Sequence, residues 1–304
     1  METVSLNFTD CPPQIEHYLL RLLEKRYRVV RDDRPEFLVY ALTGHRHRLY
    51  NCVKIYTHHE TYRPDWKQCD FAILPFSLPD PRCFYLPIYA FDRSPEPLLR
   101  GSLDAAHIRA SKPRFCALLS NYADRTVAGR IRFFHALNRR RRVDSVGRGL
   151  NNAGFAGIPG QEAKLAFYRQ YRFVIAFENK DLPGWTTEKM YDPLAVHAIP
   201  VFWGDAEVGR VFQPGCFINA RDFNDPEELA DHVLQVDDDF ERYRRYVETP
   251  PFAGNRAPDV FSEDALLDFF GRIFSAPYRP VAQRRWFFPL TKWRLAKRNK
   301  LPTE

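Results

Sequence analysis

The stretch FENKDLPGWTTEK, residues 177–189, lies between two apolar runs, FVIA (173–176) and AIPVFW (198–203). Short and nearly continuous apolar runs of this kind are typical of strands that are buried on both faces of a parallel sheet. A helix is expected between them, beginning at about Thr187, because parallel neighbours need a long crossover connection. The stretch therefore predicts an α/β fold with a largely parallel sheet.

The same alternation of strands and helices extends along the rest of the chain. An amphipathic helix is expected at 13–27, with a proline near its start. Strand-like runs, rich in β-branched and aromatic residues, occur at 4–8, 27–30, 36–42, 53–57, 70–76, 114–121, 173–177 and 199–204. No internal repeat is present. A second alternation of strands and helices begins at residue 114, and the pattern indicates two α/β domains.

The domain boundary is expected in residues 92–112, which are polar and contain prolines. We predict two Rossmann-like domains that face each other across a cleft, residues 1–112 and residues 113–275. A tail, residues 276–304, follows them. At 304 residues the chain is long enough for two domains of ordinary size.

The positive charge of the chain is concentrated in its tail. The net charge is +7, from 45 basic and 38 acidic residues. Removing the eight Lys and Arg and the single Glu of residues 279–304 leaves 37 residues of each sign. A neutral body does not favour a broad nucleic-acid-binding face, so no nucleic-acid partner is expected.

The tail also interleaves aromatic and aliphatic residues with its cations, for example in RRWFFPLTKWRLAKRNK, residues 284–300. Such a composition suits the interface of an anionic membrane. The alternative is a helix that packs on the body and exposes a basic face. No apolar run approaches the ~18–20 residues of a membrane-spanning helix, and the N-terminus lacks a secretory signal. The six cysteines show no metal-binding spacing. We therefore expect a cytoplasmic protein, peripheral on the inner membrane face.

Residues 178–189 carry the groups that suggest a ligand site. In open α/β sheets, ligands bind beyond the carboxyl ends of the strands, where Glu178 and Asn179 are expected. Thr186 or Thr187 can cap the following helix, whose free N–H groups attract anions, and Lys189 adds a positive charge. The pattern predicts a diphosphate site that needs no metal. The alternative is an ordinary capped helix on the surface.

Residues 173–205 resemble the signature of the α-1,3/α-1,4-fucosyltransferases, glycosyltransferase family 10, in their soluble bacterial form. That signature is an apolar strand, Phe-Glu-Asn, a spacer, Thr-Glu-Lys, an apolar helix and a strand that ends in Gly. Further segments resemble the family in the same order, at 59–76, 114–121, 130–138 and 143–152. The resemblance covers roughly residues 1–250.

The resemblance implies a GT-B fold and the inverting transfer of L-fucose from GDP-fucose. The acceptor would be a hydroxyl of a glycan containing GlcNAc or Glc, most simply in α-1,3 linkage, and lipid-linked as in lipopolysaccharide. Glu60 matches the general base. The positions that match donor contacts are Arg130, Asn179, Trp185, Thr187, Glu188 and Lys189. Trp185 replaces the usual Tyr, and Pro193 is expected to kink the helix.

The chemistry of these residue types fits the implied reaction. A carboxylate such as Glu60 can take the proton of the attacking hydroxyl. Arg130 can bind phosphate oxygens through two N–H groups, and Lys189 supplies a point charge. Glu188 can accept hydrogen bonds from sugar or ribose hydroxyls. Fixed cations of this kind make a metal or other cofactor unnecessary.

Three other interpretations are open to the sequence. The chain could be a GT-B transferase for another nucleotide sugar, or a basic-tailed nucleic-acid-binding protein. Residues 237–239, Asp-Asp-Asp, could form a metal-binding acidic motif, although capping of the next helix is the preferred interpretation. His58 and His59, beside Glu60, lack a third ligand at a suitable spacing and are interpreted as loop residues.

Overall fold

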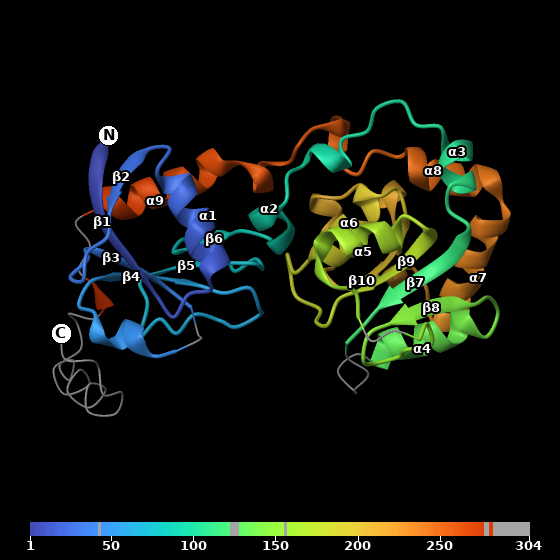
Figure 1. Ribbon diagram of the computed structural model, residues 1–304, viewed down its shortest axis with the longest axis horizontal. Helices are drawn as coiled ribbons and strands as arrows, with labels where there is room; N and C mark the ends of the chain where they lie inside the picture. The colour runs from blue at the N-terminus through green and yellow to red at the C-terminus, as the bar shows by residue number, and fades with distance from the viewer. Residues whose placement is uncertain (42–43, 122–127, 155–156, 277–279, 282–304) are drawn as a thin grey trace. The chain divides into compact units, whose positions relative to one another are not determined.

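The computed structural model describes residues 1–41, 44–121, 128–154, 157–276 and 280–281. The chain divides into two compact units (Figure 1). The first unit contains Met1–Leu86 and the residues from Ser262 onward, and the second unit contains Pro87–Phe261. The predicted tail lies outside the described residues from 277 onward, apart from 280 and 281.

The first unit is built on a parallel sheet with the strand order β2-β1-β3-β4-β5-β6. Every strand pair in it is parallel. The strands are β1 (Glu2–Thr9), β2 (Tyr27–Val30), β3 (Phe37–Tyr40), β4 (Val53–Thr57), β5 (Phe71–Leu74) and β6 (Cys83–Tyr85). Its helices are α1 (Pro13–Leu23), the short 3-10 helix η1 (Arg46–Leu49) and α9 (Glu263–Ser275).

Helix α9 belongs to the first unit, although the sequence placed residues 263–275 in the C-terminal domain. Its Phe269 ring contacts the rings of Phe71, at 6.2 Å, and Phe84, at 5.4 Å between centroids. Phe274 contacts Tyr27 edge-on at 5.2 Å. The apolar face of α9 thus covers strands of the first sheet. The polypeptide therefore passes from the first unit to the second and returns to the first at Ser262.

The boundary between the units also differs from the predicted residue 112. Residues from Pro87 onward pack within the second unit. Tyr89, for example, is fully buried and its ring lies 5.4 Å from that of Phe212. The polar, proline-containing segment 92–112 is therefore part of the second unit rather than a linker.

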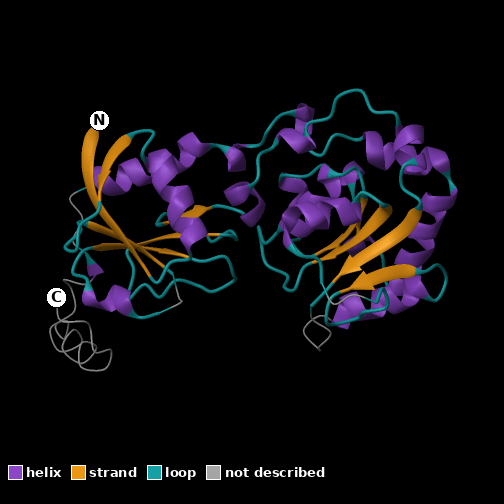
Figure 2. Ribbon diagram, viewed as in Figure 1, coloured by secondary structure: helices purple, strands orange, loops and turns teal. Residues whose placement is uncertain are grey.

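The second unit contains a parallel sheet with the order β11-β10-β9-β7-β8. Figure 2 draws its strands in orange and the surrounding helices in purple. Its strands are β7 (Arg114–Leu119), β8 (Val143–Val146), β9 (Tyr171–Phe177), β10 (Ile199–Trp203) and β11 (Ile218–Asn219). Its α-helices are α2 (Ile88–Asp92), α3 (Ala105–Ala110), α4 (Ala128–Asn138), α5 (Gly160–Tyr168), α6 (Glu188–Ala195), α7 (Pro226–Asp238) and α8 (Phe240–Glu248). Short 3-10 turns lie between α2 and α3, between β10 and α7, and after α8.

Helices cover both faces of this second sheet. Phe173, Ile175 and Phe177 of β9 share a core with residues of α4, α7 and α8. Val174 points to the opposite face and packs with Tyr168 of α5. Both faces of β9 are apolar because both are buried, which explains its continuous apolar run. The prediction of two parallel α/β units is confirmed, whereas their placement about a cleft stays a prediction.

Among the described residues, no helix has the length and apolar character needed to cross a membrane.

Candidate active site

The candidate site of the second unit begins at the carboxyl end of β9, where Glu178 and Asn179 follow the strand directly. The neighbouring strand β10 ends at Trp203 and is followed by Gly204. A Cβ atom on Gly204 would lie 2.8 Å from the Cβ and Cγ atoms of Glu178, and its φ is +157°. Glycine at 204 therefore leaves the space in which the Glu178 side chain is buried.

Glu178 binds the start of α6. Its Oε1 accepts hydrogen bonds from the backbone N–H of Thr187, at 2.8 Å, and from the Thr187 hydroxyl, at 2.7 Å. Its Oε2 lies 3.0 Å from the Lys189 ammonium. A buried carboxylate at a helix N-terminus is stabilised by the N–H groups and the helix dipole. The sequence placed Glu178 at this end of the sheet but did not predict its contacts with Thr187 and Lys189.

Thr187 is the N-cap of α6. The sequence had offered Thr186 and Thr187 as the two candidates for this cap. The Thr187 hydroxyl accepts from the Lys189 backbone N–H at 3.3 Å. The other candidate, Thr186, instead donates its hydroxyl to Asp205 at 3.2 Å. The two neighbouring threonines thus hold different elements: one begins α6 and the other connects to the residue after Gly204.

Lys189 and Glu188 form a coupled charge pair at the first turn of α6. The Lys189 ammonium lies 3.9 Å from a carboxylate oxygen of Glu188 and 3.0 Å from Glu178. Burial alone would lower the pKa of Lys189, but the two carboxylates raise it. Burial alone would raise the pKa of Glu188, but Lys189 and Lys164 lower it to about 2. Glu188 is therefore an ionised group that only accepts hydrogen bonds.

Lys164 of α5 is a site residue that the sequence did not predict. Its ammonium lies 2.7 Å from Asp192 of α6 and 3.8 Å from Glu188. Asp192 is fully buried and also accepts from Arg93 at 3.0 Å and from Gln161 at 2.8 Å. These residues are distant in the sequence, and no local pattern links them. Their charges become neighbours only when α5 packs on α6.

Arg130 and Asn179, which the sequence assigned to one site, do lie together. Arg130 donates to the Asn179 side-chain oxygen at 2.6 Å, to the Phe177 carbonyl, and to the Ser120 hydroxyl at 3.2 Å. Only 3% of Arg130 is exposed. Its N–H groups hold the end of β9, and the predicted bidentate contact with a phosphate stays a prediction.

Trp185 is also buried, with 5% of its surface exposed, and its indole N–H has no hydrogen-bond partner. It belongs to the loop that joins Asn179 to α6. Arg221 holds this loop near the end of β10, because it pairs with Asp181 and donates to the Gly204 carbonyl at 2.7 Å. The loop is thus tied to the sheet on either side of Trp185.

The C-terminus of α6 is held as firmly as its start. His197 has a φ of +57° and its N–H bonds to the Leu194 carbonyl, while Ala198 N–H bonds to Pro193. This is a Schellman motif with His in the left-handed position. Two cations bind the last carbonyls of the helix: the partly buried Arg100 binds Leu194 at 2.9 Å and the buried Lys112 binds Val196 at 2.8 Å.

Pro193 lies in the last turn of α6, which ends two residues later at Ala195. The proline removes one backbone donor there, close to the point at which the helix stops.

Glu60 belongs to the first unit. It is exposed and follows β4, three residues after Thr57. Its backbone N–H donates to Nδ1 of His58 at 2.9 Å. Glu60 thus lies at the carboxyl end of a parallel strand, as expected for a residue that acts on a ligand.

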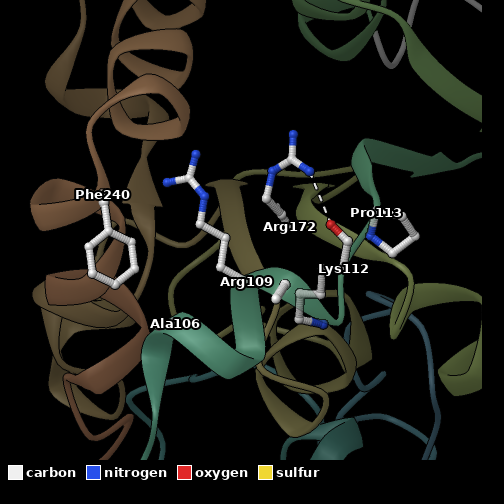
Figure 3. Close-up of a pocket in the computed structure, with 7 residues that line it drawn as sticks. Ala106, Arg109, Lys112, Pro113, Arg172 and Phe240 are labelled. Carbon is white, nitrogen blue, oxygen red and sulfur yellow. Dashed lines mark hydrogen bonds between the residues drawn. The ribbon is translucent and has the colours of Figure 1, made fainter.

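A hollow of about 610 Å³ lies elsewhere in the second unit, near the amino ends of β7 and β9 (Figure 3). Its cations include Arg172 and Lys112, which already have protein partners. Arg172 binds both carboxylate oxygens of Asp237, at 2.6 and 3.0 Å, and donates to the Lys112 carbonyl. Since the strands are parallel, this hollow is at the opposite end of the sheet from Glu178, and we do not assign it to the candidate site.

The acidic run 237–239 is occupied by structural contacts. Asp239 caps α8 by accepting from the N–H groups of Glu241, at 2.9 Å, and Arg242, at 3.2 Å. The capping interpretation is confirmed. In the part of the chain that the structure describes, no group of three or more His, Cys, Asp or Glu is placed to hold a metal ion. Independence from a metal stays a prediction.

Two family models match the chain. "Glycosyltransferase family 10 (fucosyltransferase) C-term" matches residues 109–249, and "Alpha-(1,3)-fucosyltransferase FucT N-terminal domain" matches residues 5–92. Together they span about three quarters of the chain, one model on each side of residue 100.

Curated relatives show the same resemblance over shorter segments. A putative fucosyltransferase of Acanthamoeba polyphaga mimivirus is 28% identical over 188 residues, which are 58% of this chain and 30% of the relative. An alpha-(1,3)-fucosyltransferase FucT of Helicobacter pylori is 31% identical over 134 residues, 40% of this chain and 27% of the relative. The matched part spans less than a third of either relative.

The solved structures with a similar fold include a crystal structure of an alpha1,3-fucosyltransferase with GDP-fucose. It is 20% identical, the match covers 91% of this chain and 92% of that chain, and the TM-score is 0.71. Anabaena Alr3699/HepE, solved in complex with UDP and glucose, matches with a TM-score of 0.52 at 9% identity, over 90% of this chain and 100% of that one. At these identities the comparison shows a shared fold.

Proposed function

The chain belongs to glycosyltransferase family 10, the fucosyltransferases, and has the GT-B fold. On that premise we propose that it transfers L-fucose from GDP-fucose to a hydroxyl of a glycan that contains GlcNAc or Glc. We further propose α-1,3 linkage and inversion at the anomeric carbon. The first unit supplies the general base, and the second unit holds the donor.

The start of α6 is the observation that carries this proposal. Glu178 fixes Thr187 and Lys189 in one arrangement, so an ammonium that is 25% exposed stands in the first turn of the helix. A diphosphate carries its charge on oxygens that accept such hydrogen bonds, and a helix N-terminus favours anions. Because the donors are already ordered, little reorganisation is needed as charge develops on the leaving GDP.

The remaining donor residues have roles that follow from their surroundings. Glu188 is ionised and accepts hydrogen bonds from hydroxyls of the fucose or the ribose. Arg130 and Asn179 act together, because the Arg130 guanidinium orients the Asn179 amide at 2.6 Å. In this proposal Arg130 adds positive potential beneath the diphosphate rather than a direct bidentate contact. Trp185 and Thr187 shape the loop and the first turn.

Glu60 is the proposed general base of the transfer. The acceptor oxygen attacks the anomeric carbon of the fucose as its proton passes to the Glu60 carboxylate. The bond between the anomeric carbon and the β-phosphate oxygen breaks, and GDP leaves with the electron pair. Attack on the face opposite the leaving group gives inversion. The fixed cations of the second unit stabilise GDP, so we propose that no metal is required.

A GT-B transferase for another nucleotide sugar is the second candidate, because the fold is shared with a structure that holds UDP and glucose. The family supports GDP-fucose over this alternative. The neutral body continues to argue against nucleic acid as a ligand.

Residues 282–304 have a composition that bears on where the acceptor is found. Their cations and aromatic residues suit an anionic bilayer, and we propose that this segment binds such a surface when the acceptor is lipid-linked.

The proposed function is tested by following GDP release from GDP-fucose with lactose and N-acetyllactosamine as acceptors. Calorimetry with GDP, UDP and GDP-fucose gives donor choice independently of the acceptor. We expect tight binding of GDP but not UDP, with activity unaffected by EDTA. Preference for UDP, or activity that EDTA abolishes and Mn²⁺ restores, would contradict the proposal.

A further inference from the structure

The loop after β4 carries an aromatic side chain that the protein leaves exposed. Tyr62 is 57% exposed, and it is one of four large apolar residues with high exposure in the described part of the chain, with Met1, Val30 and Phe240. Of these, Tyr62 is the one that lies two residues from Glu60. An exposed aromatic ring in the same loop as the proposed general base suits a ligand site, where rings supply contact area and polar groups supply orientation.

His58 fixes the turn that contains both residues. Its Nδ1 accepts the Glu60 backbone N–H at 2.9 Å, so this nitrogen carries no proton and the other ring nitrogen does. The contact links residue i to residue i+2, as an Asx turn does. Because it lies directly between the end of β4 and Glu60, this hydrogen bond sets the direction in which the loop leaves the sheet.

The same His58 ring holds Tyr62. The two rings meet edge to face, with centroids 5.0 Å apart and planes at 83°. The Tyr56 hydroxyl of β4 also donates to the Tyr62 carbonyl, at 3.4 Å. Tyr62 is therefore anchored by one edge and by its backbone, while most of its surface faces solvent.

We propose that Tyr62, anchored by His58, is a stacking platform for a pyranose ring of the acceptor and a determinant of acceptor affinity. This proposal rests on the proposed function, because it assigns the acceptor sugar to the loop of Glu60. A hexopyranose has an apolar C–H face and a polar rim of hydroxyls. The negative face of an aromatic ring attracts such C–H groups, and a hydroxyl on the rim can then reach the Glu60 carboxylate.

The platform is tested by binding of lactose in the presence of GDP, measured by saturation-transfer NMR, and by acceptor kinetics. Tyr62→Ala should weaken lactose binding and raise the acceptor KM by roughly two- to tenfold, the range expected for one aromatic contact. The turnover at saturating acceptor and the affinity for GDP should stay near wild type. Tyr62→Phe keeps the ring and should keep most of the affinity.

Two further variants separate this proposal from the proposed function. Phe240→Ala removes another exposed aromatic ring, in the second unit, and should leave lactose binding unchanged. Glu60→Gln should still bind lactose but not transfer fucose. Equal lactose signals from wild type and Tyr62→Ala, or no signal from wild type, would overturn the platform. Full transfer by Glu60→Gln would instead overturn the assignment of the base.

Discussion

The charges at the start of α6 connect the local structure of the chain to its proposed chemistry. Glu178 is buried, which raises its pKa, and three hydrogen bonds from Thr187 and Lys189 compensate this burial in part. Lys189 in turn is held by two carboxylates. A single residue here therefore has both a structural and a functional effect, and the two must be separated experimentally.

Lys189→Met should lower the affinity for GDP about 10- to 100-fold, as expected for a lost charged contact. It should also lower the thermal midpoint, because Glu178 stays buried without its cation. The double variant Glu178→Gln/Lys189→Met removes that unpaired charge, so it should recover stability but not GDP affinity. Calorimetric titration and thermal unfolding measure the two effects.

Arg132→Met is a matched control for changes of charge in this unit, since Arg132 is exposed on α4. It should bind GDP as wild type does. Wild-type GDP affinity in Lys189→Met, or recovery of affinity in the double variant, would contradict the assignment of Lys189 to the donor.

Glu60→Gln preserves the size of the side chain and removes its basicity. We expect transfer to fall by about 10²–10⁴-fold, the usual contribution of general-base catalysis, with GDP affinity almost unchanged. The acidic limb of the pH–rate profile should disappear. Steady-state kinetics against lactose or N-acetyllactosamine checks these outcomes.

Asp65 provides the comparison for Glu60, because it lies in the same loop and is engaged in the turn that follows. Its carboxylate accepts from the Lys67 N–H at 2.9 Å and from Gln68 at 2.5 Å. Asp65→Asn should keep most of the activity. Near-normal transfer by Glu60→Gln together with a large loss in Asp65→Asn would show that the base is misassigned.

At the level of elements, α6 is the part on which the candidate donor site depends. Glu178 and the Thr187 cap hold its start, and a Schellman motif with Arg100 and Lys112 holds its end. Burial lowers the pKa of Lys112 to about 8, since its ammonium binds only carbonyl oxygens. The helix is thus fixed along its length although it has only eight residues.

His197, at the end of α6, should make stability depend on pH. Burial, then Arg100 and Lys112, lower the pKa of His197 from 6.5 to about 4. Between these values the unfolded chain binds a proton that the folded chain does not, so stability should fall as the pH drops from about 6.5 to 4. Urea unfolding at pH 7, 5.5 and 4.5 measures this loss.

His197→Asn should reduce that pH dependence, because asparagine tolerates the left-handed backbone and does not titrate. His107→Asn, at an exposed histidine of the same unit, should leave the dependence unchanged. If His197→Asn and wild type lose the same stability between pH 7 and 4.5, then His197 is not the group that lowers the stability as the pH falls.

At the level of the whole molecule, the chain completes the first unit only after it has built the second. Helix α9 supplies Phe269 and Phe274 to the first sheet. Val281, just beyond it, donates its N–H to Asp70 at 2.7 Å. A truncation that removes the basic residues 282–304 must therefore retain α9 and Val281.

Truncation after Val281 should leave GDP affinity and thermal stability unchanged and reduce sedimentation with liposomes that contain anionic lipid. The difference should be largest at low salt, because the attraction of exposed cations to the surface is screened. A full-length protein that does not sediment with such liposomes would contradict the membrane proposal. Loss of stability on truncation would indicate a segment that packs on the body.

Features that depend on neighbours in the chain were predictable from the sequence. The strands follow from short apolar runs, and the start of α6 follows from a threonine before an acidic first turn, because cap hydrogen bonds span only two or three residues. Glu188 and Lys189 share a site because they are adjacent. The resemblance of residues 173–205 to one family also depends on local spacing alone.

Tertiary structure alone decided which distant groups meet. The family resemblance assigned Arg130 and Asn179 to one site, but their direct contact depends on the order of the strands in the sheet, which residue spacing does not specify. Lys164 meets Asp192 because α5 packs on α6. Helix α9 joins the first unit because its aromatic face fits strands more than 170 residues earlier, such as β5 and β6. The sequence shows that one face of this helix is apolar, but side-chain packing determines which sheet the face covers.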